Sequence, residues 1–177
     1  KGFKMKFINI LDTSLNNVYL NANHIVYMWE YNNKDENDEI YTLISLTDST
    51  IVEVEKIASE QVFNQLNNNF SNVFINPDEK TIERYIGALD NAIIIKNLNS
   101  EAPLQKWKNI NVPTLEKILV DIIADEKLFS AQQGELEFIF KSAFDKYNIN
   151  ESKMKRYASR RNREAEIKNQ TNIITAK

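Results

Sequence analysis

Cysteine is absent from the 177 residues of this chain, and histidine occurs once, as His24. A chain without cysteine has no disulfides, no thiol nucleophile and no cysteine-ligated zinc site. A single imidazole is too few for a metal site built from histidines, and the apolar residues that follow His24 indicate a structural position in a strand. We therefore expect no metal and no cofactor.

Glycine and proline are also scarce, with three of each. The glycines are Gly2, Gly87 and Gly134, so the chain has no glycine-rich loop that could cradle a phosphate. The glycine-flanked serine of the hydrolase nucleophile turn is missing as well. The residues form no recognisable catalytic constellation, and the chain is predicted not to be an enzyme.

No stretch of the chain approaches the roughly 18 consecutive apolar residues that a membrane-spanning helix needs. The first residues, Lys1 to Met5, lack the apolar core of a signal peptide. A hydrophobic fraction of 42% is typical of a globular protein, and a net charge of −3 is too small to imply a polyanionic partner. We expect a cytoplasmic protein that makes no contact with a membrane.

Residues 5–68 are predicted to form a small β-rich domain. Alternating or β-branched stretches predict five strands, at 6–10, 18–20, 24–31, 40–46 and 51–54. The polar cluster Thr47 to Thr50 is typical of a tight hairpin turn, so the strands are expected to form an antiparallel meander. From Ser59 the apolar spacing becomes helical, and this helix should cover one sheet face. Asp12 and Thr13, the Asn-rich turns and the segment 46–54 together resemble small FlbD-like β modules, which implies binding or regulation.

Residues 71–170 are predicted to form a mixed α/β domain that is mainly helical after residue 113. An apolar strand at 72–75 is followed by a typical helix start, with Asn76 as the predicted cap and Pro77 at the first helical position. The run 92–95 then indicates a strand that is buried on both faces. Strand, helix and strand in so few residues predict a parallel βαβ unit.

Three further helices are expected after the turn at 100–103. Thr114 is the predicted cap of the first, and Ser130 with Gln133 forms a predicted capping box for the second. Asn150 or Ser152 should begin the last helix, which is predicted to run to about residue 168. The predicted fold class is thus α+β: a small antiparallel β-meander domain with a C-terminal helix, followed by a βαβ unit and a three-helix segment.

Four short motifs occur in order in the second segment, at 100–104, 112–121, 147–150 and 156–161. Together they resemble the C-terminal region of AbiEi-like abortive-infection antitoxins. The resemblance implies a bacterial or phage protein of the type IV toxin–antitoxin kind, whose protein partner is a nucleotidyltransferase-type toxin. Members of that family pair this region with a DNA-binding winged helix, whereas residues 5–68 here are predicted to be strands. The motif positions in this sequence are Glu101, Pro103, Glu116, Lys117, Asp121 and Tyr157.

The carboxylates inside these motifs raise the alternative of a magnesium-dependent nuclease. Nucleases of the common α/β type carry a Glu-x-Lys sequence on a strand, but the strand candidate ending at Lys96 has no glutamate. Lys117 and Asp121 are four residues apart on a predicted helix and should form a surface ion pair worth a few tenths of a kcal/mol. Structural pairing is therefore favoured over catalysis.

The last predicted helix carries the best candidate binding residues. Its cations recur at spacings of three and four and would form one basic face, which suits a phosphate-rich partner. The simpler interpretation is a solvated helix whose cations complement its own negative end, since Glu164 and Glu166 interrupt the basic face. The candidate partner- or nucleic-acid-binding residues are Lys153, Arg156, Arg160, Arg161 and Arg163.

The leading hypothesis is a non-enzymatic, antitoxin-like regulatory protein that binds a toxin or a nucleic acid. A structural or phage-assembly interaction module is the alternative from another class, with the β domain as its docking surface. A metal-dependent nuclease is the weaker alternative.

Overall fold

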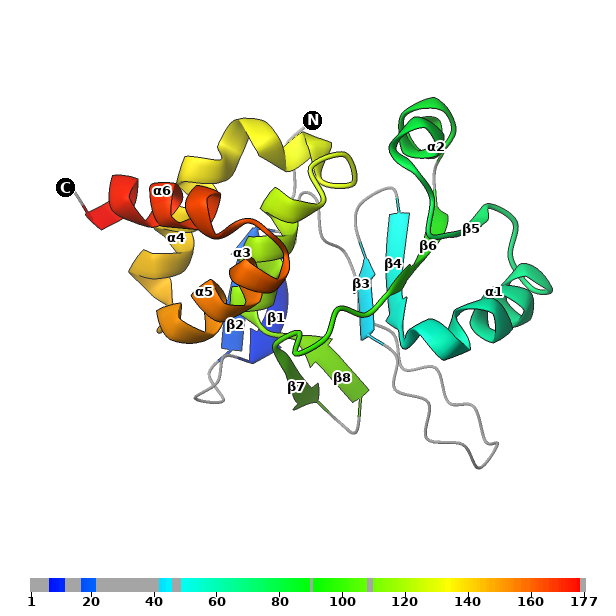
Figure 1. The fold of residues 1–177 in the computed structure, drawn as a ribbon, viewed down its shortest axis with the longest axis horizontal. Coiled ribbons are helices and arrows are strands. Elements are labelled where there is room, and N and C mark those ends of the chain that lie inside the picture. The colour runs from blue at the N-terminus through cyan, green and yellow to red at the C-terminus, as the bar shows by residue number, and fades with distance from the viewer. Residues whose placement is uncertain are drawn as a thin grey trace. The chain divides into compact units, whose positions relative to one another are not determined.

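The computed structural model describes residues 7–11, 17–21, 42–45, 49–89, 91–107 and 110–175 (Figure 1). Its strands are β1 (Phe7–Leu11), β2 (Asn17–Asn21), β3 (Thr42–Ser45), β4 (Ser49–Val54), β5 (Val73–Ile75), β6 (Ala92–Asn97), β7 (Leu104–Trp107) and β8 (Ile110–Pro113). Its α-helices are α1 (Ser59–Asn67), α2 (Glu79–Arg84), α3 (Leu115–Ala124), α4 (Leu136–Lys146), α5 (Glu151–Arg160) and α6 (Glu164–Thr175). Three short 3₁₀ helices are η1 (Lys56–Ala58), η2 (Ile86–Ala88) and η3 (Ser130–Glu135). The predicted α+β class is confirmed.

Six strands form one mixed sheet in the order β5-β6-β4-β3-β8-β7, and β1 pairs with β2 separately. β6 lies between β5 and β4 and is parallel to both of them. β4 is antiparallel to β3, with Leu43 opposite Val52. The sheet therefore combines a three-stranded parallel part with an antiparallel hairpin.

The predicted meander is corrected at β4. In a meander β4 would pair only with its neighbours in sequence, but its second partner is β6, where Ile51 lies opposite Ile94. The physical reason is burial: residues 51–54 are all buried, a continuous pattern that is typical of parallel strands covered on both faces. The predicted hairpin of β3 and β4 and the strands β1 and β2 are present, whereas the strand predicted at 24–31 lies outside the described residues.

The predicted parallel βαβ unit is confirmed by β5, α2 and β6, and a second one is formed by β4, α1 and β5. α1 begins at Ser59 as predicted and packs against β5 and β6. Its apolar side buries Val62, which joins Val54, Val73 and Ile95 in one core.

The start of α2 differs from the prediction by two residues. Asp78 is the N-cap, and its Oδ1 accepts a hydrogen bond of 2.8 Å from the Thr81 backbone N–H. Asn76 instead has a left-handed backbone with φ of 41°, and its Oδ1 accepts a hydrogen bond from the Asn97 N–H at 3.1 Å. Asn76 thus ties the end of β5 to the end of β6.

The chain divides into two compact units. The first is made mainly of residues 19–98 and 106–112, and the second mainly of residues 99–105 and 113–177. Residues 49–98, on both sides of the predicted boundary between 5–68 and 71–170, belong to the first unit. The reason is the hydrogen bonding of β4 to β6, which joins the two predicted segments in one sheet.

The chain is mainly helical after residue 113, but two details of the prediction are corrected. β7 and β8 follow the turn at 100–103, where the sequence predicted a change to helix. Ser130 lies in η3, and Gln133 makes no capping box, because its side-chain amide donates to the carbonyl oxygens of Ile122 and Phe129. Gln133 therefore satisfies carbonyl groups near the end of α3.

The predicted last helix is two helices, α5 and α6. Asn150 begins α5 as predicted, because its side chain accepts a hydrogen bond from the Lys153 N–H. Asn162 then takes a left-handed backbone with φ of 55°, a conformation that asparagine adopts more readily than most residues and that commonly ends helices. The chain turns there before α6 begins.

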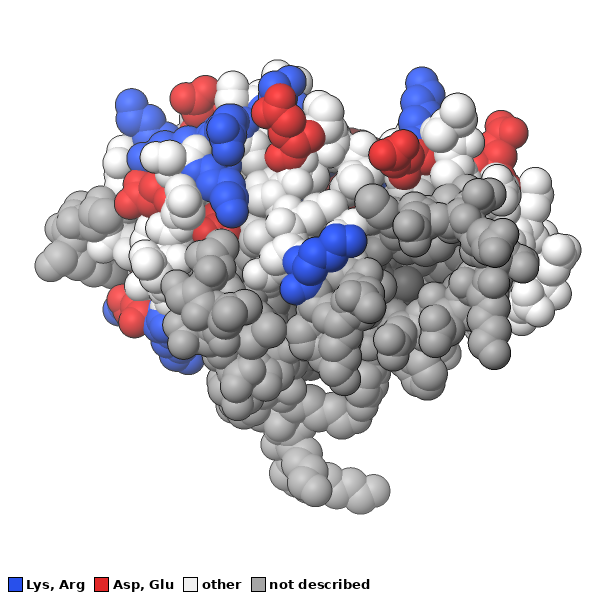
Figure 2. Space-filling model, turned by 90° about the horizontal axis from the view of Figure 1, so that it is seen from below, with Lys and Arg blue, Asp and Glu red and all other residues white. Residues whose placement is uncertain are grey.

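Within the described ranges no helix has the length and apolarity needed to cross a membrane. Figure 2 shows one face of the protein, where the described lysine and arginine side chains alternate with aspartate and glutamate. Basic and acidic groups are therefore mixed on this face.

Candidate functional site

The helix α3 is buried along most of its length, including its charged residues. Every residue from Leu115 to Ile122 is buried, among them Glu116, Lys117 and Asp121. The surface ion pair predicted for Lys117 and Asp121 is therefore corrected to a buried one, with side chains 0% and 3% exposed. Buried charges are costly unless they are paired and hydrogen-bonded. The partners of these charged residues therefore show whether α3 has a structural or a chemical role.

The partners of Lys117 and Asp121 form a network between α3 and α5. Lys117 Nζ donates to Asp121 Oδ2, and the Tyr157 hydroxyl donates to Asp121 Oδ1 at 2.9 Å. Lys117 Nζ also lies 5.9 Å from the centre of the Tyr157 ring, within the range of a cation–π contact. Arg161 Nη2 pairs with Asp125 Oδ2 at 2.8 Å, and Arg161 Nε lies 3.7 Å from Asp121 Oδ1. We call these five residues the α3–α5 network.

Two cations and two carboxylates balance the formal charge of the α3–α5 network. Burial by itself lowers the pKa of the Arg161 guanidinium, but the negative charges of Asp125 and Asp121 outweigh it. The pKa of Arg161 is therefore raised above its ordinary value, and the side chain stays charged at any pH at which the protein is folded. Arg161 therefore supplies a lasting positive charge to the network between the two helices.

Glu116 and Pro103 make further links inside the second unit. The Glu116 carboxylate accepts a hydrogen bond of 2.9 Å from the backbone N–H of Asn150, the residue that caps α5. The carbonyl of Pro103 accepts one of 3.0 Å from the N–H of Thr114, just before α3. Negative charge near the N-terminus of α5 is also favoured by the helix dipole. Glu116 therefore fixes where α5 starts relative to α3.

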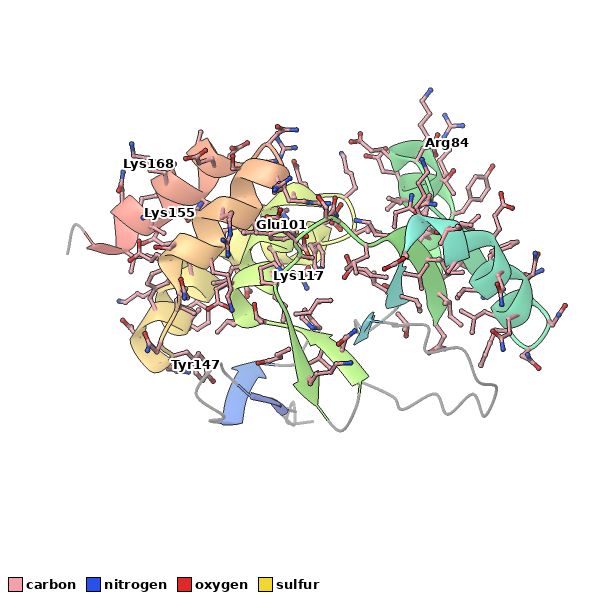
Figure 3. The ribbon with its side chains drawn as sticks, turned by 60° about the horizontal axis from the view of Figure 1, so that its bottom comes forward. Arg84, Glu101, Lys117, Tyr147, Lys155 and Lys168 are labelled. Carbon is pink, nitrogen blue, oxygen red and sulfur yellow. The ribbon has the colours of Figure 1, made fainter. Side chains whose placement is uncertain are left out.

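Glu101 is the one motif residue whose side chain pairs at the surface. It lies in the turn after β6, and its carboxylate accepts a hydrogen bond from Arg160 Nη2. The two side chains are 54% and 48% exposed. Lys117 and Glu101 thus contact α5 from two different segments, α3 and this turn (Figure 3). The structure brings all six motif residues into the second unit.

The five predicted binding cations do not form one basic face. Arg161 points into the α3–α5 network, and Arg163 follows the end of α5 and pairs with Glu166 at 3.2 Å. The other three, Lys153, Arg156 and Arg160, recur at spacings of three and four on α5, and we call them the α5 cation row. Within the described part of the chain, Lys153 and Arg156 have no side-chain hydrogen bond or ion pair.

Two contacts of the site were not predicted from the sequence. Asp125 completes the α3–α5 network, and Asn150 was predicted as a cap but not as the partner of Glu116. Lys117, Asp121 and Asp125 follow one another at intervals of four, which places them on one side of α3. That spacing was the available signal for Asp125, whereas nothing local to Glu116 indicates a residue 34 positions away.

Carboxylates are the ligands that a magnesium ion would need. In the residues that the structure describes, no group of three or more His, Asp or Glu side chains is placed to hold a metal ion. Glu116 contacts a backbone N–H, and Asp121 contacts Lys117 and Tyr157. These groups are arranged as structural links.

Comparison with known proteins gives one result. Residues 37–177 match DUF6577, a family of unknown function, and this match spans most of the chain. No curated protein and no solved structure matches the chain. No named family supports the AbiEi-like or the FlbD-like resemblance. The chain belongs to the family DUF6577.

Proposed function

We propose that this chain is a non-enzymatic, antitoxin-like regulatory protein that acts by binding a macromolecular partner through the α5 cation row. The observation that carries the proposal is that the second unit has two sets of charged residues, one buried and one at the surface of α5. The buried motif residues Glu116, Lys117, Asp121 and Tyr157 hold α3 and α5 together, whereas Arg156 and Arg160 of the α5 cation row are exposed and Lys153 is half-buried.

A binding function agrees with the burial and pairing of the charged groups on α3. A lysine that acts as a nucleophile or a base must reach its substrate, but Lys117 is fully buried and paired with Asp121. A surface that binds a partner needs a rigid support, and the α3–α5 network supplies one under the α5 cation row. The residues that look most reactive therefore serve the scaffold.

The proposed partner is a nucleotidyltransferase-type toxin, the partner implied by the AbiEi-like resemblance, and the proposed place of action is the cytoplasm. The same resemblance leaves a nucleic acid as the alternative partner. Arginine suits both, since its planar guanidinium makes two parallel hydrogen bonds to a carboxylate or a phosphate.

An assembly module is the second candidate, favoured by apolar side chains on the first unit. Ile57, Phe70 and Tyr85 are all exposed there. Single exposed apolar residues are common on soluble proteins, so this observation is weaker support than the arrangement of the second unit.

Co-expression tests the proposed function. The chain and the nucleotidyltransferase encoded beside it in the native genome would be expressed together in a bacterial host, and growth would be measured. Rescue is expected with the wild type and should be lost with Lys153→Glu plus Arg156→Glu. The matched control, Lys141→Glu plus Lys146→Glu, makes the same charge change at exposed positions of α4 and should keep rescue.

Failure of the wild type to rescue growth would overturn the antitoxin-like function. Cleavage of nucleic acid by the purified chain with Mg²⁺, abolished by Glu116→Ala, would favour the nuclease alternative instead. Copurification with a large particle, unaffected by the changes on α5, would favour the assembly module.

A further inference from the structure

We propose that the α5 cation row binds a carboxylate-bearing segment of a protein, and that Glu101 competes with this segment for Arg160. The inference rests on the proposed function, because it names the class of partner for the same surface. The inference adds an intramolecular contact that blocks part of the binding surface, because the Glu101 carboxylate occupies Arg160 at one end of the row.

The contact between Glu101 and Arg160 has the properties of an exchangeable one. Both side chains are about half exposed, so water and salt screen their attraction, and such pairs contribute little to folding. Glu101 comes from the turn after β6, 59 residues before Arg160, and therefore approaches α5 from outside the helix. A carboxylate of a partner would approach Arg160 from outside the helix in the same way.

The backbone of Glu101 supports this reading. Its φ of 55° lies in the left-handed region, which few residues other than glycine, asparagine and aspartate adopt at low cost. A glutamate in this conformation is held at some cost in the turn, in the position from which it reaches Arg160. The turn thus places the Glu101 carboxylate within hydrogen-bonding reach of Arg160.

The rest of the α5 cation row is open to a partner. Lys153 and Arg156 make no ion pair or side-chain hydrogen bond within the described residues, and Arg156 is exposed. Arg160 follows Lys153 by seven positions, which corresponds to about 10 Å along the helix axis. Carboxylates at intervals of three and four on a partner helix would have the same spacing.

The mixed charges around the row favour a protein over a nucleic acid. Glu151, Glu164 and Glu166 are exposed on the same or the following helix, and Glu101 lies at the end of the row. A phosphate backbone carries unbroken negative charge and would be repelled by these carboxylates, whereas a protein surface can place a cation opposite each of them. The exposed residues of α5 also include no aromatic ring on which a base could stack.

The test is fluorescence anisotropy with the full chain and two labelled probes at low salt. One probe is a helical peptide with glutamates at intervals of three and four, and the other is a 20-base-pair DNA duplex. We expect the wild type to bind the peptide more tightly than the duplex. Lys153→Gln plus Arg156→Gln should weaken peptide binding at least fivefold, while the matched control Lys141→Gln plus Lys146→Gln should leave it unchanged.

The decisive variant is Glu101→Gln, because it removes a negative charge and frees Arg160. Peptide binding should become about 1.5- to 5-fold tighter, the range expected when an exposed ion pair is lost from the free protein. Glu101→Ala should act in the same direction, and thermal unfolding would verify that both variants fold.

Unchanged or weaker peptide binding by both Glu101 variants would overturn the competition. Tighter binding to the duplex, with the same dependence on Lys153 and Arg156, would overturn the choice of a protein segment. If either of these results were found while the wild type still rescued growth, the antitoxin-like function would stand and only this further inference would fail. If the wild type failed to rescue growth but the peptide results were as expected, the antitoxin-like function would fail and the peptide binding would stand.

Discussion

Two lysine–carboxylate pairs in the second unit have the same spacing but different surroundings. Lys117 and Asp121 lie on α3 with side chains 0% and 3% exposed, and Glu151 and Lys155 lie on α5 with side chains 45% and 47% exposed. Each pair joins residues four apart in the sequence. The energetic meaning of a pair therefore depends on the solvent around it, because water weakens the attraction but also solvates a charge that loses its partner.

Replacement of the lysine in each pair by methionine should separate these cases. Lys117→Met leaves Asp121 with a buried charge that has lost its closest partner, so we expect a loss of about 3 kcal/mol in the free energy of unfolding. Lys155→Met removes an exposed pair and should cost less than about 0.5 kcal/mol. Urea unfolding at pH 7 measures both values. Similar small losses in the two variants would show that the Lys117 ammonium reaches water.

The N-terminal ends of the helices show which of the predicted capping residues form capping hydrogen bonds. Asn150 caps α5 through its side chain, and Asp78 caps α2 in the same way. The predicted caps Asn76 and Ser130 were wrong. Asn76 instead bonds the end of β6 through its side chain, and Ser130 lies inside η3. Asparagine, aspartate and serine all suit a cap, so the residue type alone does not select among neighbouring candidates.

The cap of α2 should make its stability depend on pH. Hydrogen bonds from the Thr81 side chain and from its backbone N–H lower the pKa of Asp78 below its ordinary value. A lowered pKa in the folded state means that the stabilisation is present above the pKa of the unfolded chain and is lost as the pH falls through the folded pKa. Asp78→Ala should therefore destabilise the protein at pH 6 and have less effect near pH 2.5.

Asp78→Asn is the control for this prediction, since it keeps a side-chain acceptor but does not titrate. Unfolding midpoints measured for the wild type and both variants across this pH range give the comparison. An effect of Asp78→Ala that is the same at both pH values would contradict the lowered pKa.

At the scale of the whole molecule, each of the two units has its own buried side chains. In the first unit Ile94 and Ile95 lie at the centre of the parallel strands. In the second unit Phe140, Met154 and Ile167 come from α4, α5 and α6, and α6 contacts both α4 and α5. Most of the free energy of folding should come from these two sets of buried apolar groups.

Substitutions in the two cores should act on different units. Ile94→Ala should cost about 3 kcal/mol and Phe140→Ala about 4 kcal/mol, because each leaves a cavity at a fully buried position. The controls Ile57→Ala and Phe138→Ala change side chains that are 91% and 61% exposed and should cost less than about 0.5 kcal/mol. Hydrogen exchange should locate the loss of protection in the unit that carries the core substitution. Equal loss in both units after either change would show that they unfold as one.

Local patterns were sufficient for much of the fold. The helical spacing after Ser59, the cap at Asn150 and the strand–helix–strand order of residues 73–97 were all predictable, because each depends on residues close together in the sequence. The candidate site was predictable only as a set of residues: the motif positions and the cations were named, but not their contacts.

The amino-acid sequence by itself determined the α+β class, the type of most helices and strands, and the residues of the α5 cation row. Only the tertiary structure decided that β4 pairs with β6, that Lys117 and Asp121 are buried, and that Glu101 reaches Arg160. The physical reason is distance along the chain. Periodicity and capping act within one or two turns, whereas strand partners and the burial of charge are set by segments that meet only when the chain has folded.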